Sequence, residues 1–244
     1  MSSIKNGSPE PSKLWQGKTW TQLLAVALGV LPLYSSLVIL QLKSNRTIPI
    51  QGFTFYLAVI SPLSIVIVLL LLRFLCGEKP RDINLRQGKL SSDLLAMLIL
   101  TTVILLTNVV STYFLSELLP DSPSSTSVTN LFEELASNPG LLVLFAGPLF
   151  LLGAASEEVV RVLLLSRLWK VWPSTPARLA SVVISAVLFG LIHLYQGPVN
   201  ATWTAIFGLI LAFYYLRFGR AAPMILSHYM TNALQIVLFA LLKL

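Results

Sequence analysis

The chain has 244 residues, of which 55% are hydrophobic and only 11% are charged, and its formal net charge is +7. Soluble domains carry about 25% charged residues. So few charges could not cover a globular surface, which excludes an ordinary soluble domain and indicates a chain whose solvent is lipid. We expect the positive charge to contact lipid headgroups rather than nucleic acid, because no basic stripe is interleaved with aromatic residues.

Residues 1–18 are polar and rich in Ser, Pro, Gly and Lys, which predicts a flexible tail. Residues 19–244 are expected to form a transmembrane helical domain. Seven apolar segments long enough to cross a bilayer, or nearly so, follow one another: Trp20–Leu40, Phe53–Leu72, Leu94–Leu115, Gly140–Leu165, Leu179–Leu194, Ala201–Leu216 and Ala221–Leu242. The third loop, Pro120–Pro139, is long enough for a short helix around Leu131–Ala136. The predicted fold is an all-α polytopic membrane protein, a bundle of seven to eight transmembrane helices around a polar intramembrane cavity.

The lysines and arginines between these segments alternate from loop to loop. The tail and the even-numbered loops carry 13 of them, whereas the odd-numbered loops and the C-terminus carry 3. The positive-inside rule then places the N-terminus in the cytoplasm and the C-terminus outside. We expect an integral, multi-pass protein of a bacterial inner or thylakoid membrane. The one cysteine, Cys76, allows no internal disulfide and is no basis for a metal site.

A few strongly polar side chains fall inside the predicted spans. A charge at the centre of a spanning helix costs roughly 2.5–3.5 kcal/mol, so such residues indicate a functional site unless they only pair with one another. The set is Glu157, Glu158, Arg161, His193, His228 and Asn232. The competing interpretation is a buried ion pair and interhelical hydrogen bonds that hold helices together.

The spacing of these residues favours chemistry. Arg161 lies four residues after Glu157 and three after Glu158, so one arginine faces two carboxyl groups and can neutralise only one. The other is available for general-base catalysis. Phe189 shares a helix face with His193, and His228 shares one with Asn232. Two histidines, an asparagine and two glutamates can together activate water and stabilise an oxyanion.

Their depths test whether these residues meet. At about 1.5 Å per helical residue from the nearest cytoplasmic charge, His228 lies about 12 Å deep, Glu157 about 15 Å, Asn232 about 18 Å and His193 about 22 Å. All four fall in the middle of a membrane about 30 Å thick. The spread of about 10 Å requires a tilted helix or a lower start of the fifth span.

At this point the chain resembles a known family. Glu157-Glu158 followed by apolar residues and an arginine, Phe189-Gly-Leu-Ile-His193 and His228-Tyr-Met-Thr-Asn232 are similar, in this order, to the three motifs of the CAAX-protease-and-bacteriocin-processing (Abi-type) intramembrane proteases. The stretch from Gly208 to Pro223 is also similar. The resemblance covers roughly residues 140–235. One departure is that only Val159 and Val160 separate the glutamates from Arg161, whereas the family pattern has three residues there.

The resemblance implies a bundle of about eight transmembrane helices around a cavity that opens to the cytoplasm, and an intramembrane endopeptidase. Its eukaryotic members remove the C-terminal tripeptide of prenylated CAAX proteins, so the implied partner is a peptide or protein, lipidated substrates included. Carried over, Glu157 and His193 activate water and His228 and Asn232 hold the oxyanion. Glu158, Arg161 and Phe189 support the site, and no cofactor is expected.

Three alternatives remain open. Glu and His side chains can also bind zinc, although no His-Glu-x-x-His motif is present; loss of activity on chelation would favour this metalloprotease. The shifted arginine favours a non-catalytic membrane scaffold or a bacteriocin-immunity protein. A small-molecule transporter is the third alternative, but no inverted repeat supports it. Function retained after Glu157→Gln would favour a non-catalytic protein.

Overall fold

The computed structural model describes residues 18–43, 49–83, 85, 88–119 and 123–242, all without a β-strand. Within these ranges, six helical segments are long and apolar enough to cross a membrane: Thr19–Ile39, Ile50–Leu75, Leu90–Leu118, Pro139–Val171, Pro198–Phe218 and Ala222–Leu242. A shorter apolar helix covers Thr175–Leu191. The predicted all-α polytopic fold is therefore confirmed. The predicted tail lies outside the described residues, except for Lys18.

The helices follow the predicted order and mostly exceed the predicted lengths. Their bounds are α2 Thr19–Lys43, α3 Ile50–Phe55, α4 Ser61–Leu70, α5 Leu90–Leu118, α6 Pro123–Ser137, α7 Pro139–Leu144, α8 Phe150–Val171, α9 Thr175–Leu191, α10 Pro198–Phe218 and α11 Ala222–Leu242. Three π-helical turns, Tyr56–Ile60, Leu71–Leu75 and Phe145–Leu149, join or extend these helices. The helix predicted in the third loop is α6, and it is longer than the sequence indicated.

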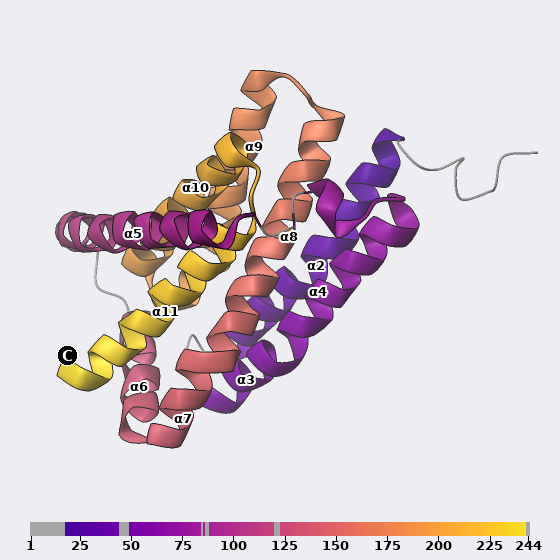
Figure 1. Ribbon diagram of the computed structural model, residues 1–244. Coiled ribbons are helices and arrows are strands. Elements are labelled where there is room, and N and C mark those ends of the chain that lie inside the picture. The colour runs from indigo at the N-terminus through magenta and orange to yellow at the C-terminus, as the bar shows by residue number, and fades with distance from the viewer. Residues whose placement is uncertain (1–17, 44–48, 84, 86–87, 120–122, 243–244) are drawn as a thin grey trace, which may run out of the picture.

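Helix α8 is the centre of the bundle (Figure 1) and packs against α2, α4, α9 and α11. Every residue from Ser156 to Arg167 is buried. This burial follows from the sequence, because charged side chains of α8 must be shielded from lipid by protein. Helix α5 packs on α10 and α11 and runs across the direction of α8 in Figure 1. Much of its apolar surface is exposed, as expected of a helix at the periphery of the bundle in lipid.

The fifth span differs from the prediction. Helix α9 begins at Thr175, with a proline in its first turn, and ends at Leu191. His193 was predicted inside this span but follows its end, in a short segment that contains the 3₁₀ turn Leu194–Gln196. The sixth span, predicted to be short, is the 21-residue helix α10.

Charged side chains lock the end of α8 that lies near the α8–α9 turn. The fully buried Arg167 donates to both carboxylate oxygens of Glu78 at 2.7 Å and to Gln22 Oε1 at 3.0 Å. Lys170 also bonds to Glu78. Burial raises the pKa of Glu78, but the hydrogen bonds from Arg167 and Lys170 outweigh it and hold the pKa below its ordinary value. This cluster ties α2 and the segment after α4 to α8.

Candidate active site

The two adjacent glutamates of α8 have different surroundings. Glu157 accepts a hydrogen bond from the Tyr56 hydroxyl at 3.0 Å. Glu158 is fully buried and lies between Arg161 and His228. Its Oε2 is 3.2 Å from Arg161 Nε, and its Oε1 is 2.9 Å from His228 Nδ1. The positive charge of Arg161 thus compensates the negative charge of Glu158. The neighbours of Glu157 are instead the Tyr56 hydroxyl and the His228 ring.

Besides Glu158, two further groups hold Arg161 in place. Its Nη1 donates to the Gly208 carbonyl at 2.8 Å, and its guanidinium lies 4.1 Å from the centre of the Phe189 ring. Position 208 has to be small, because a Cβ there would lie 2.7 Å from Arg161 Nη1 and 2.9 Å from Phe189 Cδ1. The shifted arginine therefore pairs with Glu158, three residues before it, and fills a pocket between α9 and α10.

His193 is positioned by the end of α9. Its Nδ1 lies 2.8 Å from the Phe189 carbonyl oxygen, and its ring packs edge-on against the Phe189 ring with centroids 4.7 Å apart. A carbonyl only accepts, so Nδ1 carries the proton and Nε2 of the neutral ring has a free lone pair. Gly197 completes the turn into α10 with a φ of 90°, a conformation that suits glycine.

His228 faces both glutamates. Its Nδ1 is bonded to Glu158, as described above, and its Nε2 lies 3.6 Å from Glu157 Oε2. Because an ionised carboxylate only accepts, Nδ1 donates to Glu158 and Nε2 is directed toward Glu157. The rings of Phe189 and Phe207 pack edge-on against the imidazole, with centroids 5.9 and 4.8 Å away. Contacts on both sides thus fix the orientation of this ring.

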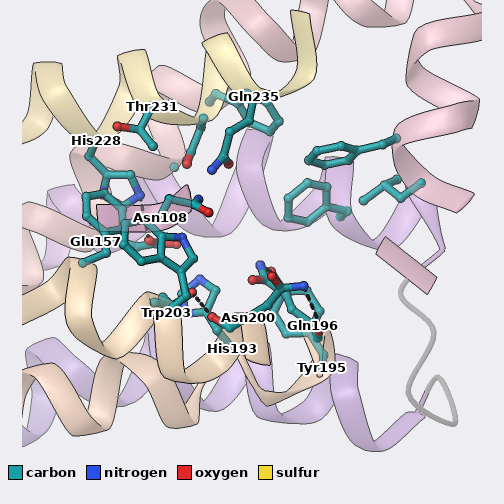
Figure 2. A pocket seen from close by; sticks show the side chains of 18 of the residues that line it. Asn108, Glu157, His193, Tyr195, Gln196, Asn200, Trp203, His228, Thr231 and Gln235 are labelled. Carbon is teal, nitrogen blue, oxygen red and sulfur yellow. Dashed lines mark hydrogen bonds and ion pairs between the residues drawn. The ribbon is translucent and has the colours of Figure 1, made fainter. Parts of the chain in front are cut away.

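A cavity of about 430 Å³ joins these groups, a size typical of small-ligand and cofactor pockets. It is lined by five of the residues singled out from the sequence: Glu157, Phe189, His193, His228 and Asn232. Figure 2 shows Glu157, His193 and His228 around the same space. Glu158 and Arg161 do not line the cavity and lie behind Glu157 and His228. The structure therefore brings the predicted residues together in two layers.

Several polar residues of the cavity were missed in the sequence. Asn108 and Gln235 lie inside spans, yet they were not among the predicted intramembrane polar residues. Both are uncharged and, unlike Asn232, neither lies within one of the three motifs. Tyr56 was missed because tyrosine is common near span ends. In the structure, Tyr56 begins a π-helical turn, and such turns are frequent at functional sites.

The cavity extends from Glu157 toward one end of the bundle. Leu131 and Phe132 of α6 line it, as do Tyr195 and Gln196 before α10. These residues belong to the predicted third and fifth loops, which contain no lysine or arginine. Helices α6 and α7 lie at one end of α8 and the basic α8–α9 turn at the other (Figure 1). Two expectations from the sequence therefore disagree: the charge bias places this cavity on the outer side, whereas the family resemblance implied a cytoplasmic opening.

In the described part of the chain, no group of three or more His, Cys, Asp or Glu side chains is arranged to hold a metal ion. The carboxylate of Glu158 and the Nδ1 atoms of both histidines already have protein partners.

The comparisons with known proteins give one match. Residues 139–234 match the family model described as type II CAAX prenyl endopeptidase Rce1-like. No curated protein and no solved structure matches the chain. The matched region runs from the start of α7 into α11 and contains all three motifs, with nearly the bounds expected from the sequence. The resemblance drawn from those motifs is thus confirmed, and at the coarse level it indicates a protease that acts on a peptide or protein.

Proposed function

We propose that this chain, whose residues 139–234 match the Rce1-like family model, is an intramembrane endopeptidase that hydrolyses a peptide bond with water activated by Glu157 and His193. The observation that carries the proposal is the convergence of Glu157, His193, His228 and Asn232 on one cavity. These residues come from α8, α11 and the segment after α9. If these residues served only to hold helices together, a cavity of this size beside Glu157 would not be needed.

The first step is the activation of water. Glu157 accepts a proton from a water molecule in the cavity, and the lone pair of His193 Nε2 accepts its second hydrogen bond. The resulting hydroxide attacks the carbonyl carbon of the peptide bond. The carbon–nitrogen bond then breaks, and the proton held by Glu157 passes to the leaving amine. One water is consumed, and the products are a new carboxyl terminus and a new amino terminus.

The second requirement is stabilisation of the oxyanion. Asn232 forms no hydrogen bond within the described part of the chain, so its amide N–H groups are available to the cavity. With both ring nitrogens protonated, His228 donates Nδ1–H to Glu158 and presents Nε2–H to the oxyanion. Glu158 and Arg161 act as positioning residues, because they orient His228 and balance its charge.

Tyr56 is a further positioning residue in this mechanism. Its hydroxyl donates to Glu157 Oε1, which fixes the carboxylate rotamer and leaves Oε2 directed toward His228 and the cavity. The hydroxyl is almost fully buried, so bulk water cannot replace it. A fixed carboxylate is a better base than a mobile one because the proton acceptor is already in place.

We propose that the reaction uses no metal. Activation of water by Glu157 and His193 requires none, and most of the alternative ligands already have partners. Dialysis of the purified protein against a strong chelator is expected to leave cleavage unchanged. Loss of cleavage on chelation, with recovery on added zinc, would favour the metalloprotease instead.

The experiment that tests the function is cleavage by the purified protein in lipid vesicles. Glu157→Gln keeps the shape and removes the base, and His193→Ala removes its partner. Each is expected to abolish most of the turnover, and the double variant is expected to be little slower than either single one, because the two act as a unit. Full activity in Glu157→Gln would contradict the proposal and favour a non-catalytic scaffold.

A further inference from the structure

Tyr195 lines the cavity but has no role in the mechanism described above. It lies in the 3₁₀ turn Leu194–Gln196, two residues after His193, and the centroids of the two rings are 5.8 Å apart. The residue is buried, with 7% of its surface exposed. A buried tyrosine hydroxyl usually has a partner for its proton, so the direction of this proton is informative.

The Tyr195 hydroxyl accepts a hydrogen bond but donates none to the described residues. Gln196 Nε2 donates to the hydroxyl oxygen at 3.0 Å, which Figure 2 shows as a dashed line. Within the described ranges, no acceptor takes the Tyr195 proton. A phenol keeps its proton until far above neutral pH. The hydroxyl therefore has a free donor at the edge of the cavity.

The turn that carries Tyr195 is held at both ends. The backbone N–H of Gln196 donates to the His193 carbonyl at 2.9 Å, and the Asn200 side chain donates to the Gln196 carbonyl at 3.0 Å. Gly197, with its φ of 90°, then directs the chain into α10. Tyr195 is therefore fixed relative to His193, and a donor fixed in this way is preorganised for a ligand.

This donor lies across the cavity from the proposed oxyanion site. In Figure 2, His193 and Tyr195 lie on one side of the open space, and His228 and Gln235 of α11 lie on the other. The reacting carbonyl of a substrate would face α11, where the oxyanion is held. Successive carbonyl groups of an extended chain point in opposite directions, so the neighbouring carbonyl of the substrate would face the wall that carries Tyr195.

We propose that Tyr195 donates a hydrogen bond to a peptide carbonyl of the substrate next to the cleaved bond, and that Gln196 is the positioning residue that directs this proton into the cavity. The inference rests on the proposed protease activity and adds to it a substrate contact made by the segment after α9. The contact is present before and during the reaction, so it contributes to substrate binding and not to the chemical step.

The probe is a mixed-sequence library of apolar peptides, prepared with and without a prenylated CAAX sequence at the C-terminus. The peptide that the wild-type protein cleaves fastest in vesicles, and that Glu157→Gln does not cleave, serves as the substrate. Tyr195→Phe removes the hydroxyl and keeps the ring. KM should rise about five- to tenfold, and kcat should stay within about twofold of the wild-type value. A lower kcat at unchanged KM would overturn the inference.

Gln196→Glu tests the direction of the proton while the hydroxyl stays in place. A carboxylate only accepts, so it should draw the Tyr195 proton away from the cavity, and KM should rise about as much as in Tyr195→Phe. Gln235→Glu is the control, because it adds the same charge on the opposite side and Gln235 forms no hydrogen bond within the described ranges. An unchanged KM in Gln196→Glu, or an equal rise in Gln235→Glu, would contradict the positioning role.

A third variant keeps this test decisive if Gln196→Glu does not accumulate as folded protein. Gln196→Leu removes the same donor without adding a charge. It should raise KM by itself but add nothing in a chain that already carries Tyr195→Phe, because the two residues act through one hydrogen bond. Independent, additive increases in KM would contradict the proposed pairing.

The outcomes separate this inference from the proposed function. Glu157-dependent cleavage with equal KM values in the wild type and Tyr195→Phe would overturn the inference and leave the protease activity intact. No Glu157-dependent cleavage of any peptide in the library would overturn the proposed function, and the inference with it.

Discussion

Replacement of Tyr56 by phenylalanine removes the hydrogen bond to Glu157 and little else. The ring of residue 56 would keep its stacking with Phe53, whose centroid lies 6.5 Å away. A hydrogen bond to a charged group contributes about 1.5–3 kcal/mol. If that energy holds the carboxylate in its reactive rotamer, kcat should fall roughly 10- to 100-fold, since 1.36 kcal/mol corresponds to a factor of ten. KM should change little, because the hydrogen bond that is lost orients the base, Glu157.

A matched control is available in the same chain. The Tyr215 hydroxyl is also buried and donates to the Ile83 carbonyl at 2.9 Å, but it does not line the catalytic cavity. Tyr215→Phe should lower the thermal stability to a similar or smaller degree, by about 1 kcal/mol, and leave kcat unchanged. The assay is steady-state cleavage of a reporter peptide together with thermal unfolding in the same detergent. Equal kcat values for the two variants would refute the positioning role of Tyr56.

Three further predictions concern the support of the site, the lock of α8 and the topology. Gly208→Ala forces Arg161 to move by its added Cβ, so turnover should fall at least several-fold while helix content by circular dichroism is retained; unchanged turnover would show that the arginine contact is dispensable. Glu78→Gln leaves Arg167 without its carboxylate and should lower stability near neutral pH by about 3 kcal/mol. Because the folded-state pKa of Glu78 is lowered, its stabilisation is present above the unfolded value and is lost as pH falls through the folded one. The gap in unfolding temperature between wild type and variant should therefore close at acid pH, and a gap independent of pH would contradict the assignment. A cysteine at Gln196, in a variant without the native cysteine, should react with an impermeant thiol reagent from outside intact cells, since we propose that the cavity opens away from the cytoplasm; labelling only after permeabilisation would reverse the topology.

Much of the fold could be predicted because composition and hydropathy report directly on contact with lipid. The spans and their order follow from runs of apolar residues, and the helix in the third loop was expected from the length of that loop. The end of α9 could not be predicted in this way. Residues 192–194 are as apolar as a helix interior apart from His193, and only the packing of Gly190 against α10 and the turn at Gly197 reveal where the helix stops.

Of the candidate site, only the charged residues and the residues of the three motifs could be predicted from the sequence. Glu157, His193, His228 and Asn232 were found because such residues are costly in a membrane, and they do meet at one cavity. Which glutamate Arg161 faces depends on the rotation of α8 against α10, and sequence spacing allowed both. Tyr56 bonds to Glu157 across 101 positions of sequence. No local pattern reports a contact between helices so far apart in the chain.

The central position of α8 has a consequence for how the protein is made. As the helix leaves the ribosome it carries Arg167 near its end and Glu157, Glu158 and Arg161 farther inside, where each charge opposes insertion by roughly 2.5–3.5 kcal/mol. The partners on the N-terminal side, Gln22, Tyr56 and Glu78, are already in the membrane at that moment, so Arg167 and Glu157 can reach native contacts at once.

The partners on the C-terminal side arrive later. Gly208 and His228 are synthesised 47 and 70 positions after the residues of α8 that they contact. Until then Glu158 and Arg161 have only each other, one helical turn apart. A nascent chain halted after α8 should therefore already contain the contacts of Arg167 with Gln22 and Glu78 in their final form. The part of α8 that carries Glu158 and Arg161 still lacks its contacts with Gly208 and His228 at that stage.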